Sequence, residues 1–248
     1  MKIQLFSFPV KRFTNKERQN RIDFIIRNIN NSEADFIMFS EHVLNNKDDL
    51  YLIGKRIKNR HISALFEIPE SKNIEGNRLY LLKNNHIEDL ETHQIFATSK
   101  EATDTSVELL IHEMEVHRQF KVSSKNFLVI QCGENNLLKG NSGVARFRSE
   151  KREDLKLRFS ELLGKTDVVL NPVHSPWKRF GCYLSRLRAL SDGERYCFSC
   201  TRLFGNQLEK AKKKPGYNIT QIAMHNTERI APIVTEDESL CLIQTYEI

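Results

Sequence analysis

Three short runs of apolar residues, each bounded by polar residues, constrain the fold of this chain most strongly. The runs are Phe36–Phe39, Phe127–Ile130 and Val168–Leu170. A run that is apolar at every position is typical of a strand buried on both faces, as in sheets whose faces are covered by helices. The sequence therefore favours an α/β or layered α+β fold.

Amphipathic segments lie between these runs, so strands and helices are predicted to alternate. Thr14 and Glu17 form a capping box ahead of isoleucines at helical spacing, which predicts a helix over 15–30. Further helices are predicted around 50–57, at 150–163 and around 184–190. Further strands are predicted at 2–8, 61–66, 77–82, 92–97, 116–122, 195–200, 218–223 and 239–246.

Length and composition fit one sizeable core. The chain has 248 residues, of which 40% are hydrophobic, and we find neither a repeat nor a long linker. We therefore predict a single domain over 1–248. No apolar run approaches the roughly 18 residues of a membrane span, and the N-terminus lacks a signal-peptide core, so we expect a cytoplasmic location without a membrane partner.

The five cysteines do not predict a disulfide framework, because their number is odd and the chain is long. Cys197 and Cys200 have the spacing of a metal or redox pair, but no second such pair exists. In a strand over 195–200, Tyr196 and Phe198 would share one face, and Cys197 and Ser199 the other. We interpret these cysteines as buried structural thiols, and we expect no metal site.

Positive charge is concentrated in one part of the chain, although the formal net charge is only +6. The segment 176–214 holds ten Lys or Arg against three Asp or Glu. Such a segment can bind nucleic acid or another polyanion, or it can be a solvated helix and loop. No nucleic-acid-binding motif supports the first interpretation.

Three polar residues follow predicted strands, where α/β folds usually build active sites. Glu41 ends the run before it, Lys100 follows the strand predicted at 92–97, and Cys132 follows the strand ending at Gln131. A thiol needs activation to react at neutral pH, and a nearby carboxylate can take its proton. An ammonium group can stabilise the oxyanion formed on sulfur attack. Glu, Lys and Cys are thus sufficient for acyl transfer.

In this arrangement the sequence resembles the nitrilase, or carbon–nitrogen hydrolase, superfamily, whose members use a Glu–Lys–Cys triad. Asp35–Glu41 is similar to the family strand that ends in the catalytic Glu, and Lys100 takes the position of the catalytic Lys. Phe127–Asn135 resembles the nucleophile motif, with the Cys-Gly-Glu-Asn form of the nitrilase branch. Ser40 departs from the Pro that commonly precedes the Glu, and the residues beside Lys100 also depart from the family pattern.

The resemblance implies roles for further residues. Many members have a second Glu between Lys and Cys, for which Glu108 is our candidate and Glu101 and Glu113 are competitors. The family's oxyanion hole includes the backbone N–H that follows the nucleophile, here that of Gly133.

Glu134 and His174 are further substrate-binding candidates. The implied fold is a four-layer αββα sandwich, often assembled as a dimer, with no cofactor. The implied substrate is an amide, with a nitrile as the alternative.

Two other classes of function compete with this interpretation. A metal-dependent phosphoesterase of the endonuclease/exonuclease/phosphatase type also opens with a strand, a helix and a strand ending in Glu. It requires an Asn in the first strand and a terminal Ser-Asp-His, and the sequence has neither. The second alternative is a non-catalytic binding module on the nitrilase fold, which would use its basic surface.

Overall fold

The computed structural model describes the chain in segments that cover most of the sequence. The described residues are 1–9, 14–40, 42–69, 77–141, 144–173, 180–203, 220–238 and 241–248. The chain divides into two compact units. Unit 1 comprises Met1–Glu91, Cys200–Gln221 and Pro232–Ile248, and unit 2 comprises Thr92–Ser199 and Ile222–Ala231. The single domain expected over 1–248 stays a prediction.

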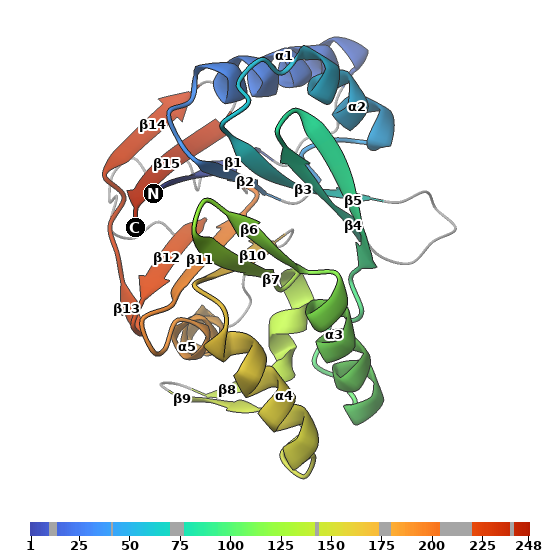
Figure 1. Cartoon of the computed structure of the whole chain (residues 1–248), viewed down its shortest axis with the longest axis vertical. Helices are drawn as coiled ribbons and strands as arrows, with labels where there is room; N and C mark the ends of the chain where they lie inside the picture. The colour runs from blue at the N-terminus through green and yellow to red at the C-terminus, as the bar shows by residue number, and fades with distance from the viewer. Residues whose placement is uncertain are drawn as a thin grey trace. The chain divides into compact units, whose positions relative to one another are not determined.

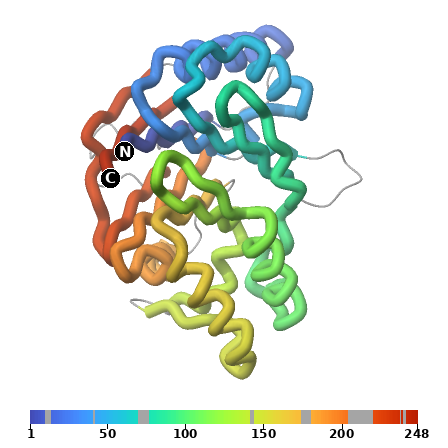
Figure 2. Tube along the Cα trace, viewed as in Figure 1, coloured from blue at the N-terminus to red at the C-terminus, as the bar shows by residue number. Residues whose placement is uncertain are grey.

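Unit 1 is built on a seven-stranded mixed sheet (Figure 1). In spatial order its strands are β14 (Val234–Glu238), β15 (Cys241–Glu247), β1 (Lys2–Ser7), β2 (Phe36–Phe39), β3 (Ser63–Pro69), β4 (Asn77–Lys83) and β5 (His86–His93). The central strands β1, β2 and β3 are parallel, and all four residues of β2 are buried, as its continuous apolar run predicts. The two chain ends meet in this unit (Figure 2), where the Met1 amino group donates to the Ile248 carbonyl oxygen at 2.7 Å.

Two helices, α1 (Asn15–Asn31) and α2 (Lys47–Arg56), lie along one face of this sheet (Figure 1). The capping box predicted at Thr14 and Glu17 is present at the start of α1. The predicted apolar stripe of α1 is buried against the sheet in one hydrophobic core with residues of α2 and β2. Ser40, which directly follows β2, is fully buried and donates its backbone N–H to the Phe6 carbonyl oxygen.

Unit 2 is built on a second sheet of six strands. In spatial order they are β13 (Glu228–Arg229), β12 (Gln221–His225), β11 (Tyr196–Thr201), β10 (Val168–Val173), β7 (Lys125–Val129) and β6 (Gln119–Val122). β7 and β10 are parallel neighbours, with Phe127 opposite Val168. The carboxyl ends of these two strands therefore lie at the same edge of the sheet.

The core of unit 2 is completed by three helices, a short 3-10 helix and a two-stranded hairpin. They are α3 (Asp104–Val116), η1 (Cys132–Leu137), β8 (Leu138–Asn141), β9 (Val144–Phe147), α4 (Glu153–Gly164) and α5 (Phe180–Leu190). The hairpin packs on α5, where an added Cβ at Gly140 would lie 2.4 Å from the Cys182 carbonyl oxygen. Gly140 therefore permits a close approach of the two backbones.

Two strand predictions are wrong in position, and one helix is missing from the sequence interpretation. The strand expected at 92–97 is β5 at His86–His93, because the chain then leaves the sheet. The strand expected at 116–122 is shortened to β6, because residues up to Val116 belong to α3. Val107, Leu110 and Met114 recur at helical spacing there and are buried in the core, so the same periodicity argument could have found α3.

The alternation predicted for β11 is confirmed by its rings. Tyr196 and Phe198 stack with centroids 6.4 Å apart, so they share one face. Cys197 belongs to the core of unit 2, whereas the Cys200 sulfur lies 3.2 Å from the Ser7 hydroxyl in unit 1. The two thiols therefore have separate buried surroundings. Among the described residues, no helix is long and apolar enough to cross a membrane.

Candidate active site

Cys132 is the first residue of η1, directly beyond the end of β7. Gln131 before it has extended backbone angles, and the chain then turns into the 3-10 helix. The Cys132 side chain is 6% exposed, although the strand residues before it, Phe127–Ile130, are almost completely buried. The thiol therefore lies at the carboxyl edge of the sheet of unit 2, where the sequence analysis predicts a nucleophile.

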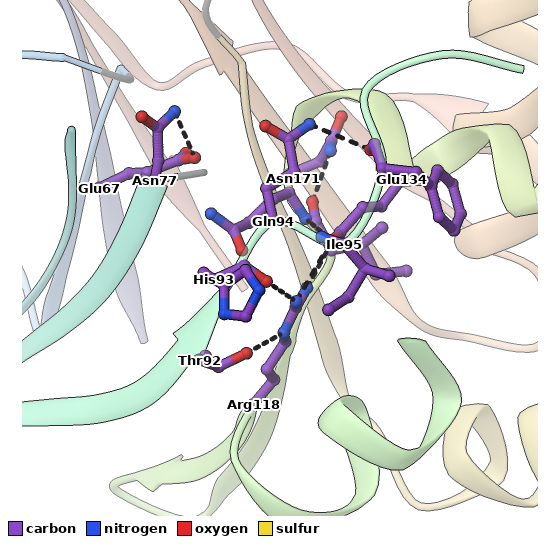
Figure 3. Close-up of polar contacts among 12 residues, drawn as sticks. Glu67, Asn77, Thr92, His93, Gln94, Ile95, Arg118, Glu134 and Asn171 are labelled. Atoms are coloured by element: carbon purple, nitrogen blue, oxygen red, sulfur yellow. Dashed lines mark hydrogen bonds and ion pairs between the residues drawn. The ribbon is translucent and has the colours of Figure 1, made fainter. Parts of the chain in front are cut away.

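Glu134 holds this turn together from inside. Its carboxylate accepts the N–H of Ile95 at 2.6 Å and the N–H of Gln131 at 2.9 Å. It also accepts two hydrogen bonds from the guanidinium of Arg118 (Figure 3). Since all four donors belong to the protein and the side chain is fully buried, the geometry differs from the substrate contact expected for Glu134. It is a positioning residue for the turn that carries Cys132.

Arg118, which follows α3, makes these two contacts with Glu134 and two others. Its Nε donates to the Thr92 hydroxyl at 2.9 Å, and its Nη2 donates to the His93 carbonyl oxygen at 2.7 Å (Figure 3). Arg118 and Glu134 are both 0% exposed. A buried ion pair is costly to break by removing one partner, because the other partner would be left as a buried uncompensated charge. The pair therefore joins Thr92 and His93 to the turn that carries Cys132.

The segment that leads to Lys100 lies directly against the turn that begins at Cys132. An ideal Cβ added at Gly133 would lie 2.0 Å from the Ala97 carbonyl oxygen and 2.5 Å from the Ala97 Cα. No residue with a side chain fits that space without a backbone shift. Gly133 thus permits this close approach, and Ile95 reinforces it through its N–H bond to Glu134.

Lys100 lies in a turn three residues beyond this contact, and its side chain is exposed. Glu101 closes the turn, because its carboxylate accepts the N–H of Ala97 at 2.8 Å and the hydroxyl of Thr98 at 2.8 Å. These hydrogen bonds lower the pKa of Glu101. Within the described ranges, Lys100 forms no hydrogen bond or ion pair. The structure thus brings the Lys100 turn onto the Cys132 turn through the backbone of Ala97.

Glu108 does not take part in this arrangement. It is exposed on α3, and its carboxylate pairs with Arg152 near the start of α4 at 3.1 Å. The core-facing residues of α3 include Val107 and Ile111, so Glu108 falls on the outer side of the helix. The role predicted for Glu108 beside Lys100 is therefore not supported by its position. Of its competitors, Glu101 closes the lysine turn, and Glu113 is partly buried on α3.

A second buried hydrogen-bond network, which starts on the neighbouring strand β10, supports the chain just before Cys132. Asn171 on β10 donates its amide to the Ile130 carbonyl oxygen at 2.6 Å. The hydroxyl of Tyr183 on α5 donates to Asn171 Oδ1 and lies 2.6 Å from the Ser199 hydroxyl oxygen. Burial raises the pKa of Tyr183 well above its usual value. The backbone two residues before Cys132 is thus tied to α5 and β11.

Two of the predicted site residues, Glu41 and His174, lie outside the described residues. The chain is described up to Ser40, at the carboxyl end of β2, and again up to Val173, at the end of β10. Two described residues that support the Cys132 turn are not predicted by the sequence analysis, namely Arg118 and Tyr183. Tyr183 shares helical spacing with Leu187 and Leu190. Its polar hydroxyl on this apolar helix face is a sequence signal for a buried hydrogen bond. Arg118 has no such signal in the sequence.

Comparisons with known proteins show which class of protein has this fold. No protein-family model matches the chain, and no curated protein matches it by sequence. Solved structures do match it, and they include an amidase of the nitrilase superfamily. The chain has the layered α/β fold of that superfamily, which confirms the predicted fold class.

Three of these structures illustrate the likeness. An amidase mutant from Nesterenkonia sp. AN1, which shows Michael addition of acrylamide at its active-site cysteine, is 8% identical with a TM-score of 0.57. This chain is covered to 100% in that comparison, and the amidase to 93%. A cysteine-to-alanine mutant of the same amidase, in complex with butyramide, is 9% identical with a TM-score of 0.55, over 99% of this chain and 90% of its own.

A glutamine-dependent NAD(+) synthetase from Cytophaga hutchinsonii is also similar. It is 9% identical with a TM-score of 0.56, over 99% of this chain and 42% of its own length. At these identities the likeness establishes the fold alone, and the chemistry has to be argued from this chain's own residues.

Proposed function

We propose that this protein hydrolyses the carbon–nitrogen bond of a non-peptide amide with Cys132 as the nucleophile. The observation that carries the proposal is the placement of Cys132. It begins a turn at the carboxyl edge of the sheet, and the Lys100 segment packs against that turn at Gly133. This arrangement stands on the fold of a superfamily that includes amidases.

The proposed reaction has two halves. Glu41 takes the thiol proton, and the Cys132 sulfur attacks the carbonyl carbon to give a tetrahedral oxyanion. The carbon–nitrogen bond then breaks, Glu41 returns the proton to the leaving amine, and a thioester remains on Cys132. Water, deprotonated by Glu41, attacks the thioester and releases the carboxylic acid and the thiol. A nitrile, the alternative substrate, would give a thioimidate at the same sulfur.

Two groups are proposed to stabilise the oxyanion. The first is the ammonium group of Lys100, and the second is the backbone N–H of Gly133, next to the nucleophile. The observed contact between Gly133 and the Ala97 backbone supports this pairing, because it couples the two turns that carry these groups. His174 is proposed to contact the substrate, and a dimer remains the proposed assembly.

A turnover assay tests the proposal. The purified chain is incubated with short aliphatic amides, beginning with butyramide and acrylamide, and released ammonia is measured. We expect activity that Cys132→Ala abolishes while the circular dichroism spectrum is unchanged. Cys182→Ala is the matched control, because Cys182 is the most exposed thiol in the described part of the chain and belongs to no proposed catalytic group. Full activity in Cys132→Ala would contradict the proposal.

One observation favours a second candidate, a non-catalytic binding module on the same fold. Lys100 is exposed and forms no polar contact with the described residues, and the sequence around it departs from the family pattern. A protein of this kind would turn over no amide or nitrile, and its Cys132 would react like an ordinary thiol. The amide screen and the reactivity of Cys132 therefore distinguish the two candidates.

A further inference from the structure

Two arginines meet consecutive residues of η1 on the side of unit 2 that is formed by α5 and the β8–β9 hairpin. Arg186 on α5 donates Nη1 to Asn135 Oδ1 at 2.9 Å. Arg148, which directly follows β9, donates Nε to the Asn136 carbonyl oxygen. Its own N–H donates to the Leu137 carbonyl oxygen at 2.8 Å. We call Arg148, Arg186 and Asn135 the double-arginine cluster.

The cluster has no negative charge of its own. In the described part of the chain, neither arginine forms an ion pair. Residues 136–149 and α5 contain no Asp or Glu. Glu150, the next carboxylate along the chain, pairs instead with Lys139 at 3.1 Å. Burial lowers the pKa of both arginines, and the charge of Arg148 lowers the pKa of Arg186 further.

Buried donors of the cluster also lack acceptors. Asn135 is 2% exposed, and its Nδ2 has no hydrogen-bond partner among the described residues. The amide orientation is unambiguous, because a guanidinium only donates and Oδ1 must therefore face Arg186. The Nε of Arg186 is likewise buried and, within the described ranges, has no acceptor. Buried polar groups are almost always hydrogen-bonded in native proteins, so these two donors call for an acceptor beyond the described residues.

We propose that the double-arginine cluster binds a phosphate group. Two guanidiniums provide a charge of +2 and planar forks of N–H donors, which match a phosphate dianion in both charge and geometry. A single carboxylate would neutralise only one of them. Exposed Arg146 on β9 and exposed Arg188 on α5 extend the positive charge around the cluster. The phosphate would come either from a small molecule or from a nucleic-acid backbone. This binding goes beyond the proposed hydrolysis and uses none of its catalytic groups.

Calorimetric titration of the whole chain with inorganic phosphate, at constant ionic strength, tests the proposal. We expect saturable binding at one site, with chloride giving no comparable heat. Arg148→Gln and Arg186→Gln should each weaken phosphate binding at least tenfold. Arg146→Gln and Arg188→Gln are matched controls, because each removes the same charge two residues away, and each should change the affinity by less than twofold.

A further variant distinguishes a specific loss of phosphate binding from a loss of folding. Asn135→Asp keeps the side-chain shape and provides an internal carboxylate for Arg186. We expect it to abolish phosphate binding while its melting temperature equals or exceeds that of the wild type. If the wild type does not bind phosphate, or if all four arginine variants weaken it equally, the proposal is overturned.

A single-stranded oligonucleotide distinguishes the two phosphate sources. If the nucleic-acid backbone is the source, the oligonucleotide binds with strong salt dependence. Inorganic phosphate then competes with it, and both Arg186→Gln and Arg188→Gln weaken it. If a small molecule is the source, the wild type binds inorganic phosphate but not the oligonucleotide. Each of these results supports the phosphate site and assigns its source.

Discussion

The guanidinium of Arg118 and the carboxylate of Glu134 form a fully buried ion pair that joins Thr92 and His93 to the turn carrying Cys132. Its other hydrogen-bond partners are the N–H groups of Ile95 and Gln131, the Thr92 hydroxyl and the His93 carbonyl oxygen. The pair therefore positions the turn that begins at Cys132, and none of these hydrogen bonds uses the Cys132 thiol.

Breaking this ion pair should cost far more than breaking an exposed one. We expect Arg118→Met to lower the free energy of unfolding by about 3–5 kcal/mol, because Glu134 is left as a buried unpaired charge. Arg158→Met, which removes the partly exposed pair with Glu115 (2.6 Å), should cost about 0–1 kcal/mol. Urea unfolding measures both variants. Equal losses would show that the buried pair does not hold the turn.

The close packing of Gly133 against Ala97 predicts a second large effect. A methyl group at Gly133 overlaps the Ala97 carbonyl, so Gly133→Ala should cost about 1–3 kcal/mol of stability. It should also slow the reaction of Cys132 with thiol reagents, since the turn must shift. Gly164→Ala is the control, because nothing lies within 4 Å of its added Cβ. A Gly133→Ala protein with wild-type stability would contradict the observed contact.

The Glu101 carboxylate that closes the lysine turn predicts a pH dependence. Hydrogen bonds from Ala97 and Thr98 lower its pKa in the folded state, so its contribution is present above the unfolded pKa. That contribution is lost as the pH falls through the folded pKa. The stability difference between the wild type and Glu101→Gln should therefore be largest near neutral pH and shrink below about pH 4.5. Thermal unfolding from pH 7 to 3 measures it, and a difference that does not vary with pH would contradict this role.

The buried hydroxyl of Tyr183 predicts a fourth effect. Removing it in Tyr183→Phe leaves Asn171 Oδ1 without this donor, which should cost about 1–3 kcal/mol of unfolding free energy. Tyr196→Phe is the control, since Tyr196 is partly exposed and its ring stacks on His225 at 4.1 Å. It should stay within about 0.5 kcal/mol of the wild type. If the unfolding free energies of the two variants differ by less than about 0.5 kcal/mol, the Tyr183 hydroxyl does not stabilise the strand before Cys132.

The sequence predicts those features that depend on local pattern. The apolar runs correctly indicate β2, β7 and β10, and the capping box correctly starts α1. The position of Cys132 at a strand end follows from the same pattern. Pairings across long sequence separations are not predictable in this way. Arg118 meets Glu134 only because the fold brings residues 16 positions apart together.

The predicted site residues divide in the same way, into those that follow from local pattern and those that depend on tertiary contacts. Gly133 can be assigned from its neighbour Cys132, but its contact with Ala97 is a tertiary one. Glu108 is predicted from its place between Lys100 and Cys132 in the chain, and the helical phase of α3 turns it outward instead. The spacing of a residue along the chain does not specify the direction of its side chain until the secondary structure of the segment is known. The sequence analysis does not predict α3, so it cannot predict the direction of Glu108.

The central claim is that Cys132 is an activated nucleophile, and its reaction with iodoacetamide at mildly acidic pH tests this most directly. Ordinary thiols are mostly protonated there and react slowly. Cys182 is an internal control because it is more exposed than Cys132. Burial raises the pKa of Cys200 to about 12 and that of Cys197 also, so both should be inert.

We predict rapid stoichiometric labelling of Cys132 ahead of Cys182, located by mass spectrometry. Lys100→Ala should slow this labelling, whereas Lys151→Ala, which removes an exposed lysine of the same unit, should not. Slow labelling that is spread over several cysteines, or that reaches Cys182 first, would contradict the account and favour the non-catalytic binding module.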